Sequence, residues 1–98
     1  KERRDFVVKS LNNIKGINCL TPNGAFYVFP SCKSLLNKKT KLKTDTDFVQ
    51  KLLEKSNVAV VQGSAFGLDG YFRISYATSM QNLKKAMERI KSFCESLS

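Results

Sequence analysis

The side chain with the clearest chemical potential is Arg73, which lies in the middle of an apolar stretch from Gly70 to Ala77. The two-residue period of a strand predicts that Phe72, Ile74 and Tyr76 share a face that packs in a core, while Arg73 lies on the opposite face. A guanidinium is planar and permanently charged, and it binds a carboxylate through two parallel hydrogen bonds. A small carboxylic acid is therefore a candidate ligand. The alternative is an arginine that lays its aliphatic part along the sheet and keeps its charged end in water.

Three further residues, one serine and two aromatics, could reach such a site but are better explained by structure. Ser64 lies in a tight Gly-Ser-Ala turn, yet the chain has no histidine to act as its base, and the spacing departs from Gly-x-Ser-x-Gly. We interpret it as a turn residue. Tyr27 and Phe29 lie in a stretch that is apolar on both faces, so we assign them to packing. Gly67 is expected to permit an unusual backbone angle.

The three cysteines, Cys19, Cys32 and Cys94, do not indicate a disulfide framework or a metal site. They are odd in number, widely separated and unaccompanied by histidine, so neither paired cystines nor a common zinc site is supported. Reduced thiols in a cytosolic protein fit the pattern better. Cys94 falls on the apolar face of the last expected helix, whereas Cys32 follows Pro30 in an expected loop, where it can be exposed.

The composition is that of a single soluble globular domain with an excess of positive charge. The 98 residues are 42% hydrophobic and 26% charged, with a formal net charge of +9, and no apolar run approaches the roughly 20 residues of a membrane helix. Five lysines between positions 33 and 43 account for much of the excess and are typical of a solvated loop. The alternative function is a basic module that stacks exposed sheet aromatics on single-stranded nucleic acid while its lysines contact phosphate.

Periodicity and capping residues predict an α+β fold in which helices and strands alternate along one domain. Thr44 and Asp47 are spaced to cap the middle helix, which Asn57 ends, and Thr78 and Gln81 are spaced as a capping box for the last helix. The polar connection 31–46 is expected to be an excursion with some helix near its leucines. The expected helices are 3–14, 44–57 and 78–97, and the expected strands are 17–20, 25–29, 58–61 and 70–77.

Four phrases together carry a resemblance to a known family. They are NGAFYVFP (23–30), TDTDFVQKLL (44–53), VAVVQGSAFG (58–67) and GYFRISYATS (70–79). Over residues 3 to about 93, the chain resembles the carboxy-terminal small domain of bacterial-type aspartate aminotransferases, which are pyridoxal-phosphate enzymes of fold type I. Gln62 departs from the family pattern, which usually has proline before the Gly-Ser-Ala-Phe-Gly turn. The resemblance implies a short, mostly antiparallel sheet with helices packed on it.

The resemblance also implies a function for Arg73, namely binding of the substrate α-carboxylate so that the amino acid is held in the reactive orientation. It further implies that Phe66 and Gly67 help to shape the approach to the substrate region, as an alternative to the purely conformational role of Gly67. The implied reaction transfers an amino group between L-aspartate and 2-oxoglutarate through pyridoxal 5'-phosphate, and related members accept aromatic amino acids or prephenate. No catalytic residue, cofactor-binding residue or metal ligand is assigned in this chain, because no lysine here matches the family's Schiff-base segment and no glycine-rich loop is present to hold phosphate.

The chain opens at Lys1 inside an expected helix and without methionine, so we expect residues 1–98 to be one domain of a larger two-domain enzyme. The large cofactor-binding domain would be its missing partner, and this chain alone is expected to be inactive and to bind no cofactor. The family implies small amino-acid and 2-oxo-acid substrates and a homodimeric parent in the cytoplasm. Neither nucleic acid nor membrane is expected as a partner on this reading.

Overall fold

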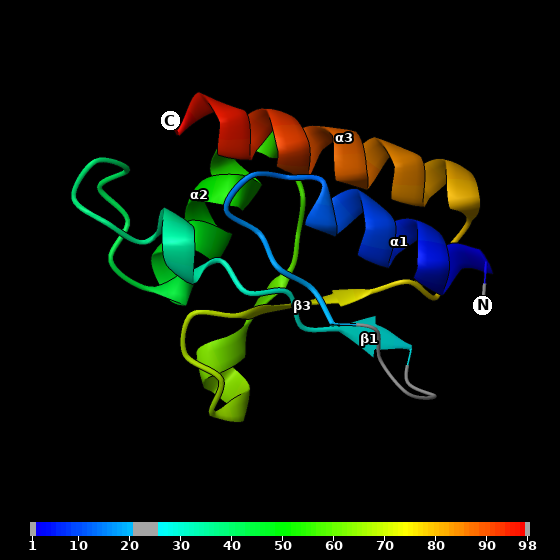
Figure 1. Ribbon diagram of the computed structural model, residues 1–98, viewed down its shortest axis with the longest axis horizontal. Coiled ribbons are helices and arrows are strands. Elements are labelled where there is room, and N and C mark those ends of the chain that lie inside the picture. Colours follow the sequence, from blue (N-terminus) through cyan, green and yellow to red (C-terminus); the bar gives the residue numbers. More distant parts are fainter. Residues whose placement is uncertain (1, 21–25, 98) are drawn as a thin grey trace.

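The computed structural model describes residues 2–20 and 26–97, and within them the elements build a small three-stranded sheet covered by helices. The strand order is β1-β3-β2, with β3 central and antiparallel to both neighbours. The α-helices lie on one face of the sheet, where α1 (Glu2–Asn12) and α3 (Met80–Ser96) run side by side (Figure 1). This confirms the predicted α+β fold. In chain order the elements are α1 (Glu2–Asn12), β1 (Tyr27–Val28), the 3-10 helix η1 (Lys33–Leu35), α2 (Asp45–Ser56), β2 (Val61–Gln62), the 3-10 helix η2 (Gly63–Phe66), β3 (Phe72–Ser75) and α3 (Met80–Ser96).

The core forms where the apolar face of β3 meets the helices. Phe72, Ile74 and Tyr76 are all buried, as their alternation predicted. Phe48 of α2 lies between two other rings, with its centroid 5.1 Å from that of Phe72 and 5.5 Å from that of Phe93 in α3. These aromatic contacts join α2, β3 and α3 around one hydrophobic centre.

The middle helix begins and ends at the residues that its capping pattern predicted. The hydroxyl of Thr44 accepts a hydrogen bond from the N–H of Asp47 at 3.2 Å, and the Asp47 carboxylate accepts one from the N–H of Thr44 at 3.4 Å. Asn57 ends the helix with a left-handed backbone (φ 56°). No helix in the described ranges is both long and apolar enough to cross a membrane.

The predicted start of the last helix was wrong by one residue. Ser79, rather than Thr78, is the capping residue, and its hydroxyl accepts a hydrogen bond from the N–H of Asn82 at 3.1 Å. Thr78 instead accepts a hydrogen bond on its hydroxyl from the Asn82 side chain, and Gln81 takes no part in the cap. Two adjacent hydroxyl residues offered alternative caps, and apolar spacing alone did not separate them. The apolar face of α3 is buried as expected, through Leu83, Met87, Ile90, Phe93 and Cys94.

Strand pairing is more limited than the apolar runs predicted. The stretch 17–20 contributes one isolated bridge, between Asn18 and Ser31, and 58–60 lie outside the sheet, which β2 joins only at Val61 and Gln62. The expectation that 25–29 is covered on both faces was also wrong. In its described part Val28 is buried, but Tyr27 is 40% exposed because the α-helices cover only the other face of the sheet (Figure 1). Phe26 shares the face of Val28, yet it is 64% exposed because it lies before the start of β1, at the edge of the sheet. Residues 21–25, including the expected turn at 22–24, lie outside the described ranges.

All three cysteines are buried free thiols. Cys94 was expected to be buried, but the expectation that Cys32 could be exposed was wrong. Ser31 bridges to both Asn18 and Tyr71, which draws this segment into the sheet, and the Cys32 thiol lies 3.4 Å from the carbonyl oxygen of Gly70. Burial raises the pKa of Cys32 to about 12, with the charge of Asp45 adding to the effect.

Thiol reagents should therefore react poorly with the native protein. Burial raises the pKa of Cys94 to about 12 and that of Cys19 to about 11, so the reactive thiolate is scarce at pH 8 as well as inaccessible. We expect little alkylation of the three thiols at pH 8 without denaturant and complete alkylation once the chain is unfolded. Peptide mass spectrometry would assign each site. Rapid labelling of Cys32 in the native protein would contradict the burial described here.

Candidate functional site

The burial pattern of β3 places Arg73 on the face opposite the buried Phe72 and Ile74, which pack against the α-helices, as the alternation predicted. Arg73 is half-buried. The central carbon of its guanidinium lies 4.3 Å from the ring centroid of Tyr27 and 4.7 Å from that of Phe66. Among the described residues, no carboxylate forms an ion pair with Arg73 and no hydrogen bond engages its side chain. The guanidinium therefore contacts two aromatic rings and retains its hydrogen-bond donors for another molecule.

Sheet register brings Tyr27 to Arg73. Tyr27 pairs with Ser75, which lies two residues from Arg73 on the same face of β3, so the tyrosine ring reaches the arginine diagonally. The assignment of Tyr27 to core packing was thus wrong, because the α-helices cover only the other face of the sheet (Figure 1). The assignment of Phe29 to packing is confirmed in part: it is half-buried and contacts Phe66 edge-on, with centroids 5.9 Å apart.

Phe66 reaches the site from η2, a turn whose backbone conformation requires glycine at Gly63 and favours it at Gly67. Gly67 ends η2 with a left-handed backbone (φ 77°), which confirms the unusual angle expected there. A β-carbon on Gly63 would collide with the carbonyl oxygens of Leu68 and Tyr71. Gln62 has φ −64°, the value that proline imposes, so the departure from the family's proline leaves the backbone proline-like.

Asp45 holds this turn in place, and sequence reasoning missed it. Its side chain is almost fully buried, and its two carboxylate oxygens accept hydrogen bonds from the N–H of Ser64 at 2.8 Å and from the N–H of Gly70 at 3.2 Å. Burial alone would raise the pKa of Asp45, but these hydrogen bonds outweigh it and leave the pKa below its usual value. As the first residue of a capped helix, Asp45 resembles an ordinary helix-dipole acid, and no local signal pointed to the distant turn.

Ser64 serves this turn through its backbone, in agreement with its interpretation as a turn residue. Its hydroxyl lies 3.4 Å from that of Thr46, a contact between two neutral side chains. The chain contains no histidine to activate the hydroxyl. The role of Ser64 is therefore to stabilise the turn and not to act as a nucleophile.

The described residues do not fit a pyridoxal-phosphate site. Every lysine that the structure describes is exposed, whereas a Schiff-base lysine is activated by desolvation or by a neighbouring cation. The amino terminus of α2, where a phosphate could bind, already carries Asp45 and Asp47. We therefore derive no step of chemistry through this cofactor from these residues.

The lysine-rich segment and the core aromatics lend no support to a nucleic-acid surface. Leu35 and Leu42 anchor the segment in the core while its lysines lie in solvent, and the short helix expected near the leucines is η1. Phe72 and Tyr76 are buried and cannot stack on bases. The aromatics that are exposed, as this alternative requires, are Phe26, Tyr27 and Phe66, and the last two contact Arg73.

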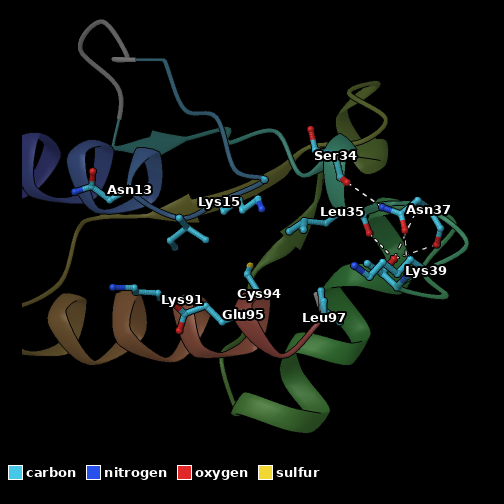
Figure 2. Close-up of a pocket in the computed structure, with 13 residues that line it drawn as sticks. Asn13, Lys15, Ser34, Leu35, Asn37, Lys39, Lys91, Cys94, Glu95 and Leu97 are labelled. Atoms are coloured by element: carbon cyan, nitrogen blue, oxygen red, sulfur yellow. Dashed lines mark hydrogen bonds between the residues drawn. The ribbon is translucent and has the colours of Figure 1, made fainter.

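A cavity of about 570 Å³ lies between the segment after α1, η1 and the end of α3. Figure 2 shows Leu35, Cys94 and Leu97 along it, with Lys15 and Lys91 beside it. Arg73 is not among its lining residues, so this cavity is separate from the arginine site.

Comparisons with known proteins agree with the resemblance seen in the sequence. A model of the family "Aminotransferase class I and II" matches residues 1–90. The chain is 55% identical over 102 aligned positions to an aspartate aminotransferase of Rhizobium meliloti (strain 1021), covering 100% of this chain and 25% of that protein. It is 57% identical to a probable aspartate/prephenate aminotransferase of Rhizobium leguminosarum bv. phaseoli, covering 94% and 24%. The chain thus spans about a quarter of the length of these curated relatives.

Solved structures give the same result. The crystal structure of the aspartate aminotransferase from Rhizobium meliloti matches with a TM-score of 0.95 at 55% identity, covering 99% of this chain and 25% of that one. An alanine aminotransferase from Pyrococcus furiosus matches with a TM-score of 0.88 at 37% identity, covering 97% and 23%. The α+β arrangement described above is therefore shared with aminotransferases named for different substrates.

Proposed function

Because this chain belongs to the class I and II aminotransferase family, we propose that it is the small domain of a larger enzyme that transfers an amino group between L-aspartate and 2-oxoglutarate. Within that enzyme, Arg73 binds the α-carboxylate of the amino acid. The relatives named for aspartate and for aspartate/prephenate support this choice of substrates. A related aminotransferase of aromatic amino acids or prephenate is the nearest alternative.

The observation that carries this function is the availability of the Arg73 guanidinium. The cation lies on the face of β3 opposite the buried Phe72 and Ile74, with no carboxylate partner among the described residues. Its N–H groups match the two oxygens of a carboxylate in one plane, which fixes direction as well as affinity. Two such hydrogen bonds restrict rotation of the substrate about its carboxylate and so set the direction of the bonds at the α-carbon.

The remaining parts of the reaction are proposed to come from outside these 98 residues. They are the pyridoxal phosphate, the lysine that binds it and the contacts that discriminate between substrate side chains. This is supported by the exposure of every described lysine and by the quarter of the relatives' length that the chain spans. The parent would be a homodimer, as the family implies, and the 98-residue chain alone would not turn over substrate.

An assay of the full-length protein tests the proposed function. Loaded with pyridoxal phosphate, it should form glutamate from 2-oxoglutarate when L-aspartate is supplied, with kcat on the order of 1 to 1000 per second. Phenylalanine and tyrosine should replace L-aspartate as amino donors in the same assay, and prephenate, a 2-oxo acid, should replace 2-oxoglutarate as the acceptor of the amino group from L-aspartate; the relative rates rank the alternatives. The 98-residue chain with the same additions is the matched control. A loaded full-length protein that transfers no amino group among any of these compounds would contradict the assignment.

A further inference from the structure

We infer that Tyr27 and Phe66 are positioning residues that hold the Arg73 guanidinium between two aromatic faces, so that only its in-plane N–H donors are presented to a ligand. We call this arrangement of the three residues the arginine clamp. The role presupposes that Arg73 binds the substrate carboxylate, as proposed above.

Both aromatic contacts are within the range of cation–π attraction. The distances from the guanidinium carbon to the two ring centroids, 4.3 and 4.7 Å, fall below the roughly 6 Å limit for such contacts. The rings come from different elements, Tyr27 from the edge strand β1 and Phe66 from the turn η2. Arg73 is thus restrained by contacts from two separate parts of the fold.

The clamp is supported independently of any substrate. Phe66 has the ring of Phe29 against it, nearly perpendicular at 79°. The turn that carries Phe66 is fixed to α2 by the two backbone hydrogen bonds to Asp45. Tyr27 is fixed by the pairing of β1 with β3. The aromatic rings can therefore hold the arginine in place before a ligand arrives.

The energetic consequence is preorganisation. A free arginine side chain loses rotamer freedom when it binds a ligand, whereas one already held by its neighbours loses less. The contacts place the guanidinium carbon over each ring, and no hydrogen bond engages its N–H donors among the described residues, so a ligand that approaches edge-on can bind these donors while the aromatic contacts persist. A planar carboxylate meets that requirement.

A double-mutant cycle in the full-length protein tests the clamp. The probe is succinate, a dicarboxylate without an amino or oxo group to react, and its dissociation constant is measured by calorimetry on the full-length protein loaded with pyridoxal phosphate. Tyr27→Leu and Phe66→Leu should each weaken succinate binding roughly 3- to 10-fold, because each removes one cation–π contact. Tyr27→Phe keeps the ring and should bind within about twofold of the unmodified protein. In an Arg73→Gln background, the two leucine substitutions should cause no further loss, because the cation that they act on is gone.

Tyr71→Leu is the matched control, because the cation over that ring is the ammonium of Lys33, at 4.9 Å. It should leave succinate binding unchanged. If Phe66→Leu does not fold, the Tyr27 variants decide the outcome alone. The clamp is overturned if Arg73→Gln weakens binding strongly while Tyr27→Leu binds normally, or if Tyr27→Leu costs the same with and without Arg73. If Arg73→Gln itself leaves succinate binding unchanged, the carboxylate role of Arg73 fails, and the clamp fails with it.

Discussion

Replacing Arg73 with alanine in the full-length protein should lower kcat/KM for L-aspartate by roughly 100- to 10,000-fold. Hydrogen bonds to charged groups contribute about 1.5–3 kcal/mol each, and two are lost, at about 1.4 kcal/mol per factor of ten in rate. KM should rise because binding weakens, and kcat should fall because the substrate is no longer held in one orientation. Steady-state kinetics over a range of aspartate concentrations separates the two effects.

Two further substitutions sharpen this experiment. Arg73→Lys keeps the positive charge but loses the planar pair of donors, so it should recover part of the KM and less of the kcat. Arg89→Ala removes an exposed arginine from α3 and should leave both constants within about twofold, since an isolated surface charge contributes little. An Arg73→Ala enzyme that retains kcat/KM within threefold of the original would show that another residue binds the carboxylate.

Asp45→Ala should produce the largest loss of structure near the site. The substitution leaves the buried N–H of Gly70 and the N–H of Ser64 without an acceptor, at about 1–3 kcal/mol for each buried group left unsatisfied. The turn that carries Phe66 is then no longer fixed to α2. We expect hydrogen exchange at these two amides in the full-length protein to accelerate by roughly 10- to 1000-fold. Exchange at amides elsewhere in the domain should accelerate less.

Asp69→Ala is the matched control, because Asp69 is an exposed acid in the same turn. It should leave exchange at Ser64 and Gly70 unchanged. Asp45→Asn is informative as well, since one amide oxygen can replace only one of the two acceptors. Unchanged protection of both amides in Asp45→Ala would mean that the turn is held by other contacts.

The depressed pKa of Asp45 gives this carboxylate a defined pH dependence. A group whose pKa is lower in the folded state stabilises the fold at every pH above its unfolded value of 3.8, and that contribution disappears as the pH falls through the folded pKa. Exchange at Ser64 and Gly70 should therefore accelerate as the pH is lowered below 3.8 in the original protein, once corrected for the intrinsic rate. In Asp45→Asn this additional acceleration should be absent.

The parts of the fold that the sequence predicted are those set by local spacing. Phe72, Ile74 and Tyr76 alternate with Arg73 and Ser75 over five residues, and that period alone separates the buried face from the open one. Thr44 and Asp47 cap α2 because their side chains reach each other's backbone within one turn. For such features the interacting groups are close in sequence, so the local sequence pattern is sufficient to predict the structure.

The parts that were missed depend on contacts between distant segments. Tyr27 is exposed because the α-helices cover only the other face of the sheet (Figure 1), and Cys32 is buried because Ser31 bridges to Tyr71. Asp45 accepts a hydrogen bond from Gly70, 25 residues away. The burial of Tyr27 and Cys32 and the hydrogen-bond partner of Asp45 could not be predicted without knowing the strand order and the path of the turn. The role of Arg73 itself came from the family resemblance, since the alternation by itself predicted only an open face.

Arg73 is only half-buried and has no carboxylate partner among the described residues, so small anions in solution can compete for its donors. Formate, acetate and other buffer carboxylates offer the same two oxygens as an amino acid, and they are commonly present at far higher concentration. If Arg73 binds the amino acid as proposed, apparent affinities will therefore depend on the choice of buffer, and constants measured in carboxylate buffers will understate the affinity of Arg73 for the amino acid.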